Sequence, residues 1–470
     1  MREAIVPIRR RKTIRLVVEP FRGRTTNINP QLTLVAGFLM IVAIGTILLT
    51  LPFSSESGEF TSFPDALFTA TSATGTVGLV VVDTATHWSR AGQVVILVLM
   101  EVGGLGFMGG AIVLFLALGR TITIHQRRVF QESLSLRRIG GVPRLARRLI
   151  IFTLLVEGIG ALLLFAQITN DPTITSEDPA WWSAIFHAVS AYTGSGFDLM
   201  GGFHSLQGAA LKPLFLLTMM AMIIPGDLGF LVVLDLLGRR KFSRLTMETK
   251  IILSANFVLW PLAALGFFVL EFANAHTLGE MPLVHKITNS VFQAVTVRNA
   301  GFSTVTFAQV GQLTLVFFMV FMVIGAASAS MGGGLKVNTL GALVAGMRAG
   351  LLGRPHAEAF GRTVSPDRIY VAVTLLLLYG AWIAIAVPIV FALQSLSSQL
   401  IPSLFDSISA LGPIGLSTGV PASLSLWGKI FMSILMFVGR LGPLTVALAL
   451  LRRSSRASLR TYPVGDLRVG

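Results

Sequence analysis

Four short segments of this chain share one pattern, and that pattern limits what the chain can fold into. Each begins with a Phe and reaches a Gly nine or ten residues later, with a small residue two positions after the Phe and a Ser or Thr four positions after it. The segments are 68–78 (FTATSATGTVG), 186–196 (FHAVSAYTGSG), 292–301 (FQAVTVRNAG) and 405–415 (FDSISALGPIG). The glycines lie 118, 105 and 114 residues apart, and Leu or Phe follows each. This recurrence predicts four copies of one structural unit.

The composition of the chain places these copies in a membrane. Of its 470 residues, 53% are hydrophobic and only 13% are charged, a balance typical of integral membrane proteins. A net charge of +15 would suggest a nucleic-acid partner for a soluble protein. Here the cations are explained by loops that face the cytoplasm, and we expect no nucleic-acid partner. The chain has no Cys, which excludes disulfides and thiolate metal sites.

Eight apolar stretches are long enough to cross the ~30 Å of bilayer hydrocarbon. They cover roughly 32–53, 91–118, 148–168, 212–238, 250–271, 312–345, 369–394 and 427–451. Between the members of each pair lies an apolar segment of about ten residues, too short to span and suited to a re-entrant pore helix, followed by a glycine loop. We therefore expect an all-α membrane protein of four tandem span, pore-helix, filter-loop, span repeats. The expected segments are a basic N-terminus 1–30, repeats 31–119, 147–240, 249–348 and 368–452, and a tail 453–470.

The charge distribution predicts the orientation. Five segments hold 30 of the 37 Lys and Arg, and they are the two ends of the chain and the three links between repeats: 1–24, 120–148, 239–250, 348–368 and 452–468. The opposite loops 54–66 and 169–180 carry acids and no Lys or Arg. The positive-inside rule therefore predicts a multi-pass protein of the plasma membrane with both termini in the cytoplasm. The glycine loops then open to the outside.

The glycine loops are candidates for an ion-selectivity filter. Irregular backbone at membrane depth must be buried in protein or line water, and a filter uses it to turn carbonyl oxygens toward a dehydrated cation. Gly adopts the unusual dihedral angles that this needs, and the nearly uncharged lining favours a monovalent cation. The expected cation-binding residues are Thr74, Gly75, Thr76, Val77, Gly78, Thr193, Gly194, Ser195, Gly196, Asn299, Ala300, Gly301, Gly412, Ile414 and Gly415. The alternative is that these glycines serve only tight helix packing. That alternative could explain a single loop, but it does not explain why four loops share the same Phe and the same spacing.

The second span of the third repeat is interrupted. The run GAASASMGGGLK at 325–336 contains three consecutive glycines and several small polar residues, which cannot sustain a helix in lipid and so should line water. Arg440 lies in the last apolar stretch, and a cation at that depth should face the cavity or a partner. Structural pairing with Glu101, Glu157 or Asp227 is the alternative for Arg440. Arg298, next to the third loop, is expected to brace the outer cavity by hydrogen bonds to backbone carbonyls.

These motifs resemble the Trk/Ktr/HKT superfamily of potassium transporters, and within it the membrane subunit of bacterial Ktr systems. The matching segments are TSATGTVGLVVVDT (71–84), VSAYTGSGFD (189–198), FQAVTVRNAGFST (292–304) and SALGPIGLSTG (409–419), and the similarity runs from about residue 30 to 451. The resemblance implies a pseudo-four-fold single-chain pore, K⁺ uptake often assisted by Na⁺, and a homodimer on a cytoplasmic ring of nucleotide-binding regulatory subunits. It implies K⁺ at Gly78, Gly196, Gly301 and Gly415. In the plant branch, a Ser at the first filter glycine goes with Na⁺ transport, so Gly78 favours K⁺.

The resemblance also assigns the interrupted span to an intramembrane gate below the filter, with an Arg of the last span opposite it. The residues that this gives are Gly325, Ser328, Ser330, Gly332, Gly333, Gly334, Lys336 and Arg440. A glycine-rich kink without a gating role is the alternative. The fourth loop contains Pro413 and the first loop contains an additional Gly75, and these two differences from the other loops leave the ion affinity open.

Two other functions compete with a K⁺ pore. One is a Na⁺/K⁺ symporter or Na⁺-conducting pore, or an alternating-access transporter; the last usually has inverted repeats, whereas these repeats share one orientation. The other is a membrane enzyme, for which the sequence offers no metal cluster, nucleophile with a base, or phosphate loop. No organic cofactor is expected in this chain, so nucleotide regulation would come through the ring partner, for which the basic linkers, especially 120–148, are the expected contacts.

Overall fold

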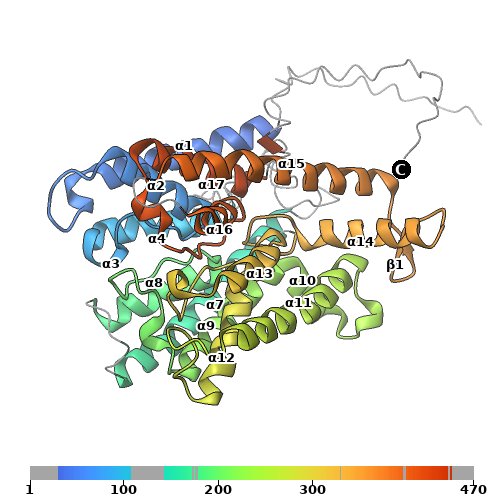
Figure 1. Ribbon diagram of the computed structural model, residues 1–470, viewed down its shortest axis with the longest axis horizontal. Coiled ribbons are helices and arrows are strands. Elements are labelled where there is room, and N and C mark those ends of the chain that lie inside the picture. The colour runs from blue at the N-terminus through green and yellow to red at the C-terminus, as the bar shows by residue number, and fades with distance from the viewer. Residues whose placement is uncertain are drawn as a thin grey trace, which may run out of the picture.

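The computed structural model describes residues 30–106, 142–171, 174, 178–328, 330–394, 399–442 and 445–446. Nearly all of the ordered secondary structure is helical (Figure 1). Within these residues, four helices are long and apolar enough to cross a membrane: α1 (Pro30–Thr50), α7 (Val142–Asn170), α11 (Met247–Glu271) and α15 (Pro366–Ala392). The protein is therefore a predominantly helical membrane protein, as its composition predicts.

A second set of apolar helices is shorter or bent. It comprises α4 (Arg90–Gly104), α9 (Pro213–Leu228) with α10 (Phe230–Arg239), α13 (Gln312–Val323) with α14 (Val337–Leu351), and α17 (Leu426–Leu441). The α9–α10 pair passes the length and hydropathy test for one span but is bent by 93° at Gly229, where a continuous helix over 212–238 was expected. Most of the remaining residues expected in the second and eighth spans, 107–118 and 443–451, lie outside the described part of the chain.

A short helix precedes each of the four glycines. These helices are α2 (Phe63–Gly75), α8 (Ala180–Thr193), α12 (Leu283–Thr296) and α16 (Leu400–Leu411). At 12 to 14 residues they are too short to cross the bilayer. Each contacts the helix that follows the preceding glycine loop: α8 contacts α4, α12 contacts α9, α16 contacts α13, and α2 contacts α17. The order of these contacts is cyclic, because α17, the last helix in the part of the chain that the structure describes, meets α2, the first short helix.

The recurring Phe and the apolar residue after each Gly explain how the short helices are held. Phe68, Phe186, Phe292 and Phe405 are all fully buried. Each lies in a different core cluster, together with the apolar residue that follows the glycine of its own loop: Leu79, Phe197, Phe302 and Leu416 respectively. Burial of an aromatic side chain of this size contributes about 1.5–3 kcal/mol. The motif is therefore a clamp that fixes a loop to the end of its own helix.

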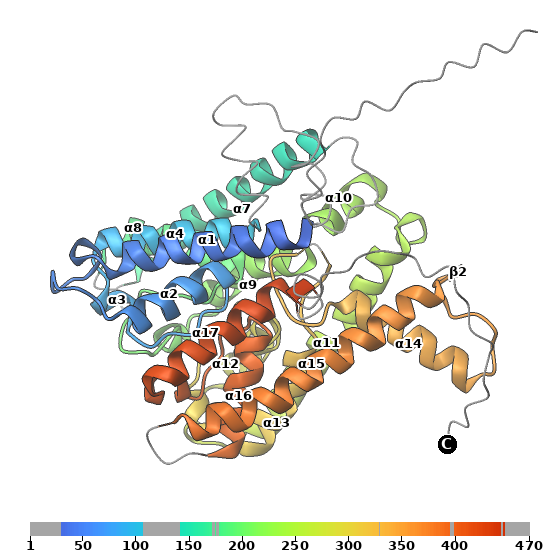
Figure 2. The ribbon, with the colours of Figure 1, turned by 90° about the horizontal axis from the view of Figure 1, so that it is seen from above.

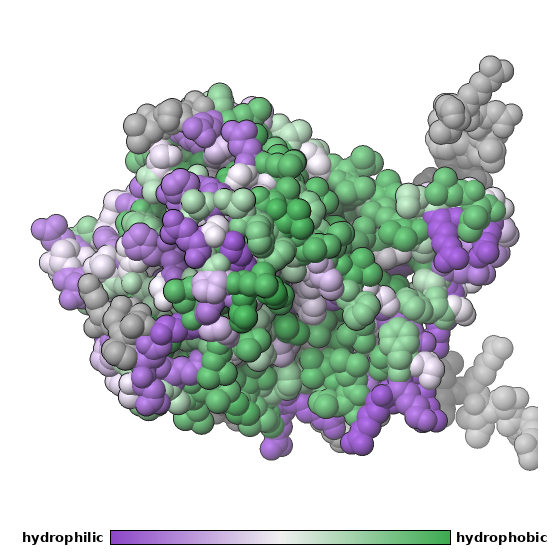
Figure 3. Space-filling model, turned by 60° about the horizontal axis from the view of Figure 1, so that its bottom comes forward, coloured by the Kyte–Doolittle hydropathy of each residue, from purple (hydrophilic) through white to green (hydrophobic). Residues whose placement is uncertain are grey.

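Polar residues gather at the two ends of the long axis, and a mostly hydrophobic surface lies between them (Figure 3). At one end lie the turn between α10 and α11 and the hairpin β1 (Glu358–Ala359) to β2 (Arg362–Thr363), on the right in Figures 1 and 2. Helix α3 (Thr84–His87) and the start of α8 lie at the opposite end. The basic segments 239–250 and 348–368 thus share one end, as the charge pattern predicts.

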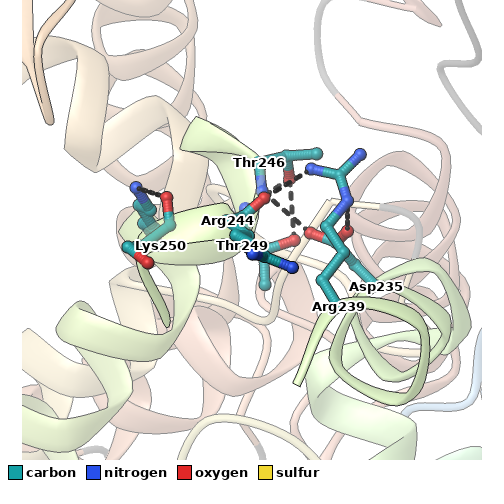
Figure 4. Close-up of polar contacts among 7 residues, drawn as sticks. Asp235, Arg239, Arg244, Thr246, Thr249 and Lys250 are labelled. Atoms are coloured by element: carbon teal, nitrogen blue, oxygen red, sulfur yellow. Dashed lines mark hydrogen bonds and ion pairs between the residues drawn. The ribbon is translucent and has the colours of Figure 1, made fainter. Parts of the chain in front are cut away.

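The α10–α11 turn is basic and is held by hydrogen bonds and an ion pair (Figure 4). The Asp235 carboxylate accepts a hydrogen bond from the Thr246 N–H at 2.9 Å and pairs with Arg239 at 3.0 Å. Arg239 also donates to the Arg244 carbonyl at 2.9 Å. Helix α11 is capped by the Thr246 hydroxyl, which accepts from the Thr249 N–H. One acid thus orders a turn that carries five cations.

Candidate functional site

The four glycine loops meet in a closed ring. A Cβ atom built on any of the four glycines would overlap the carbonyl oxygen of the residue just before the glycine in the next loop. These pairs are Gly78 with Ser195, Gly196 with Ala300, Gly301 with Ile414, and Gly415 with Val77. The fourth pair returns to the first loop. The φ angles of the glycines are +87°, +71°, +60° and +99°, in the left-handed region that favours Gly, so both the backbone conformation and the close approach require this residue.

The Ser or Thr four positions after each Phe fixes the backbone of its loop. In the first, second and fourth loops, the N–H of the residue before the glycine donates to the carbonyl of this Ser: Val77 to Ser72, Ser195 to Ser190, and Ile414 to Ser409. In the first and fourth loops the serine hydroxyl also accepts the glycine N–H, at 3.1 Å in both. The third loop is one residue shorter, and there the Gly301 N–H lies 3.4 Å from the Thr296 carbonyl.

A cavity of about 540 Å³ opens on one side of the ring. All four ring glycines line it, together with residues of the exit turns such as Asp198 and His204. Asp198 accepts the Met200 N–H at 3.0 Å, and Asp83 caps α3 and accepts the Phe203 N–H at 2.9 Å. Both acids therefore order exit turns. Burial raises the pKa of Asp198 to about 7, since the Met200 N–H only partly offsets it and the Asp83 carboxylate adds to it.

The interrupted span lies against the other side of the ring. Helix α13 ends at Val323 and α14 begins at Val337, and the segment between them folds back on itself through hydrogen bonds from Gly325 N–H to Leu335 O (2.8 Å) and from Val337 N–H to Ala326 O (3.1 Å). A Cβ on Gly333 would lie 2.5 Å from Pro413 Cγ. One on Gly332 would lie 2.9 Å from Asn299 Oδ1. We call residues 324–336 the intramembrane loop.

Two cations hold the intramembrane loop, Lys336 from within it and Arg440 from α17. Arg440 of α17 donates to the carbonyl of Met331 in the loop and to the carbonyl of Gly103 at the end of α4. Lys336 donates to the Gly332 carbonyl. Arg440 thus bridges the loop to another helix by carbonyl contacts, and the expected alternative partners Glu101, Glu157 and Asp227 form no ion pair with it.

Arg298 hydrogen-bonds backbone carbonyls as expected, but on the other side of the ring from the expected outer cavity. Its guanidinium donates to Ile324 O at 3.1 Å and Gly325 O at 2.8 Å, both in the intramembrane loop, and to the Asn256 side chain. Asp227, expected only as an alternative partner of Arg440, lies 4.0 Å from Arg298 and accepts the Ala327 N–H through its backbone carbonyl at 3.2 Å. The side chains of Arg298 and Asp227 are fully buried, and they form a 4.0 Å charge contact in which neither carboxylate oxygen of Asp227 has a hydrogen-bond partner among the described residues.

Comparison with known proteins identifies the family. The family described as "TrkH: Cation transport protein" matches residues 24–458. This chain belongs to the TrkH family. The TrkH-family chain is 36% identical over 446 residues to the "Potassium/sodium uptake protein NtpJ" of Enterococcus hirae, covering 94% of this chain and 98% of that protein. It is 35% identical over 444 residues to the "Ktr system potassium uptake protein B" of Bacillus subtilis, covering 94% and 97%.

A solved structure has the same fold. The potassium transporter TrkH from Vibrio parahaemolyticus superposes with a TM-score of 0.67 at 19% sequence identity, covering 89% of the TrkH-family chain described here and 85% of that chain. The similarity to the Trk/Ktr families expected from the motifs is therefore confirmed.

The expected cation-binding residues of this TrkH-family chain fall into two groups. Eight of them form the ring contacts: Val77, Gly78, Ser195, Gly196, Ala300, Gly301, Ile414 and Gly415. Thr74, Gly75, Thr76, Thr193, Gly194, Asn299 and Gly412 lie at or just after the ends of the short helices. Among this group, Asn299 is fully buried, and neither polar atom of its side chain has a hydrogen-bond partner among the described residues. Ser328 and Ser330 lie in the intramembrane loop. No group of three or more His, Asp or Glu side chains that could hold a metal ion occurs in the described segments.

Proposed function

We propose that this chain is a pore through which K⁺ enters the cell, with the ring of four glycine loops as its selectivity filter. One observation carries the proposal: four loops, spread over more than 300 residues of sequence, converge so that carbonyl oxygens and glycines alternate around one ring. Carbonyl oxygens replace the hydration shell of an alkali cation. The names of the relatives from Enterococcus hirae and Bacillus subtilis, both K⁺ uptake proteins, support K⁺ as the ion.

The proposed architecture is four repeats in pseudo-four-fold arrangement with eight transmembrane helices. Its support is the cyclic order in which each short helix contacts the helix after the preceding loop. In this arrangement α2, α8, α12 and α16 are the pore helices, and the 540 Å³ cavity is the outer vestibule. Both termini and the basic turn 239–250 are cytoplasmic, and the chain lies in the plasma membrane.

The intramembrane loop is the proposed gate. It lies against the third and fourth filter loops at Asn299 and Pro413, on the side opposite the vestibule. Arg440 binds the loop and adds a positive charge that repels a cation. Three glycines in succession let the loop backbone adopt different φ and ψ angles without a Cβ clash. The glycine-rich segment and Arg440 would thus act as one barrier below the filter.

The basic turn at 239–250 is the proposed contact for a cytoplasmic nucleotide-binding ring, with the chain acting as a homodimer. This turn is held by Asp235, which pairs with Arg239 and accepts the Thr246 N–H (Figure 4). The other expected contact, 120–148, lies mostly outside the described residues. Since the chain itself is proposed to carry no organic cofactor and no enzyme activity, the nucleotide response would come from the partner.

The driving force for uptake would be the membrane potential, about 2.3 kcal/mol per charge per 100 mV. We include Na⁺ as a second ion, because the Enterococcus hirae relative is named a potassium/sodium uptake protein. Na⁺ would then act either as an activator or as a transported ion. Flux driven by a K⁺ gradient alone separates a pore from an obligate Na⁺/K⁺ symporter.

The experiment is ion flux into proteoliposomes carrying the purified chain, with K⁺ or Na⁺ gradients. Gly301→Ser places a side chain against Ile414 O and Gly415 Cα, and should lower K⁺ flux by at least about tenfold, equal to 1.4 kcal/mol. Gly380→Ser is the matched control, because a Cβ there meets nothing within 4 Å. Equal K⁺ flux in the two variants, or wild-type flux that requires both ions, would overturn the K⁺ pore.

A further inference from the structure

A groove on the outer face of α11 has no part in the function proposed above. It has a volume of about 530 Å³ and lies between α11 and α12. The side chains that define it are Phe257, Trp260, Ala264 and Leu265 of α11 with Ile287 and Val291 of α12. Its size is typical of ligand sites, and its walls are apolar. The groove can therefore take an apolar ligand and no ion.

The surroundings of the groove determine which apolar ligand it meets. Helix α11 is one of the four helices able to span the membrane, and the side chains of Phe257 and Leu265 at the groove are 80% and 60% exposed, so the groove opens to bilayer hydrocarbon. Between Asn256 and Phe268, its lining residues follow α11 for about 18 Å at 1.5 Å per residue. One leaflet of hydrocarbon is about 15 Å thick, so a lipid chain fits along its length.

The floor of the groove is connected to the intramembrane loop by hydrogen bonds. Asn256 is 1% exposed; its side-chain amide donates to Ile252 O at 3.0 Å, and its Oδ1 accepts from Arg298 Nη1. The same guanidinium donates to Ile324 and Gly325 at the start of the loop. Asn256 is thus a positioning residue that joins the groove to the loop through one side chain.

Trp260 lies one helical turn from Asn256 on α11 and lines the same groove. Its indole N–H is buried and has no hydrogen-bond partner among the described residues, so packing alone sets the position of the ring. Trp260 also packs against the core cluster that contains Phe292, so the position of the ring is set by this core and by what fills the groove.

We propose that this groove binds an acyl chain of a bilayer lipid, and that its occupancy is transmitted to the intramembrane loop through Asn256 and Arg298. Only the consequence for conduction rests on the proposed gating role of the loop. The lipid site and its link to the loop can be measured without ion flux, so a failure of the proposed transport would leave both results intact.

Fluorescence quenching tests the lipid site. The full chain in detergent micelles is titrated with phosphatidylcholine carrying brominated acyl chains, and the difference between wild type and Trp260→Phe isolates one of the six tryptophans. Trp260 should reach half-quenching at a lipid fraction about fivefold below that of the other tryptophans. Ala264→Phe, which fills the groove, should abolish this difference, and Val258→Phe, on the same helix but outside the groove, should keep it.

Two outcomes of this titration would overturn the lipid site. In the first, Trp260 is quenched in parallel with the other tryptophans. In the second, Ala264→Phe leaves quenching unchanged but alters the oligomeric state, which would make the groove a contact between two copies of the chain.

Thiol labelling tests the link to the loop. The chain has no Cys, so Ser330→Cys gives a single site in the intramembrane loop for a water-soluble maleimide. Adding Ala264→Phe should change the labelling rate about fivefold, the lower range of allosteric coupling, and adding Val258→Phe should not. In an Asn256→Ala background the effect of Ala264→Phe should vanish. An unchanged rate with Ala264→Phe, or a change that persists without Asn256, would refute the coupling.

Discussion

The carbonyl oxygen of Val77 lies only 2.2 Å from where a Cβ atom on Gly415 would be, although 338 residues separate the two in sequence. The same hypothetical atom would be 3.3 Å from the Cα of Gly78. This contact closes the ring, because it joins the last glycine loop to the first. A side chain at Gly415 must therefore push the first and fourth glycine loops apart.

Replacing Gly415 by Ala should lower K⁺ flux in proteoliposomes by at least about tenfold. A suitable control is Gly419→Ala, four residues further on, where φ is +98° and a Cβ meets nothing within 4 Å. A non-glycine residue in this backbone region costs roughly 1–2 kcal/mol in both variants, but only Gly415→Ala adds the overlap with Val77. If the two variants lost flux and thermal stability equally, backbone strain alone would explain the glycine and the closed ring would not matter.

Replacing Ser409 by Ala should destabilise the fourth loop. The Gly415 N–H donates to the Ser409 hydroxyl at 3.1 Å, and a buried N–H left without a partner costs about 1–3 kcal/mol. Thermal unfolding in detergent measures the loss, and the K⁺/Na⁺ flux ratio should fall with it. Ser407→Ala provides the comparison, because the Ser407 hydroxyl is buried but has no hydrogen-bond partner among the described residues. The prediction fails if the Ser407 variant is destabilised as much.

Those parts of the fold that repeat locally could be predicted from the sequence. The Phe, the Ser or Thr and the terminal Gly recur at fixed offsets within eleven residues. The Phe packs in the core, the Ser or Thr accepts hydrogen bonds from the loop backbone, and the Gly allows the next loop to approach closely. The apolar composition likewise predicted the helical membrane class. The convergence of the four loops could also be predicted, because four similar units in one chain are expected to pack around a shared axis.

Features that depend on contacts between distant residues could not be predicted in the same way. The 93° bend at Gly229 breaks the expected span, and its local signs were Pro225, Asp227 and Gly229 itself, whose φ is +81°. Asn256 was overlooked, although one amide in an apolar span is expensive without a partner. That partner, Arg298, lies 42 residues away, and Arg298 itself was expected on the outer side because sequence distance from the filter does not tell which way a side chain turns.

Removing the charge of Arg440 should raise K⁺ flux. The guanidinium binds the intramembrane loop and the end of α4, and a unit charge within ~8 Å of the ion path is worth about 2 kcal/mol at an effective dielectric constant of 20. Arg440→Gln should therefore increase K⁺ flux about tenfold or more. Lys429→Gln is the control on the same helix, because Lys429 pairs with Asp65 at 2.6 Å and not with the loop. A lower flux in a correctly folded Arg440→Gln protein would contradict the barrier role.

External acidification should slow K⁺ entry through Asp198. This acid lines the vestibule, and burial raises its pKa to about 7. The carboxyl is therefore mostly ionised at pH 8 and mostly protonated, hence neutral, at pH 6. A unit charge ~6 Å from a cation in water is worth about 0.7 kcal/mol, so K⁺ flux at low K⁺ concentration should fall about threefold between pH 8 and pH 6.

The Asp198→Asn variant separates this group from other acids. Its flux should be independent of external pH over the same range and should match that of the wild type at pH 6, because the amide resembles the protonated carboxyl. Glu59→Gln, at an exposed acid outside the vestibule, should keep the full pH response. If Asp198→Asn still lost flux on acidification, the responsible proton would bind elsewhere, and the charge of Asp198 would have no part in drawing K⁺ toward the ring.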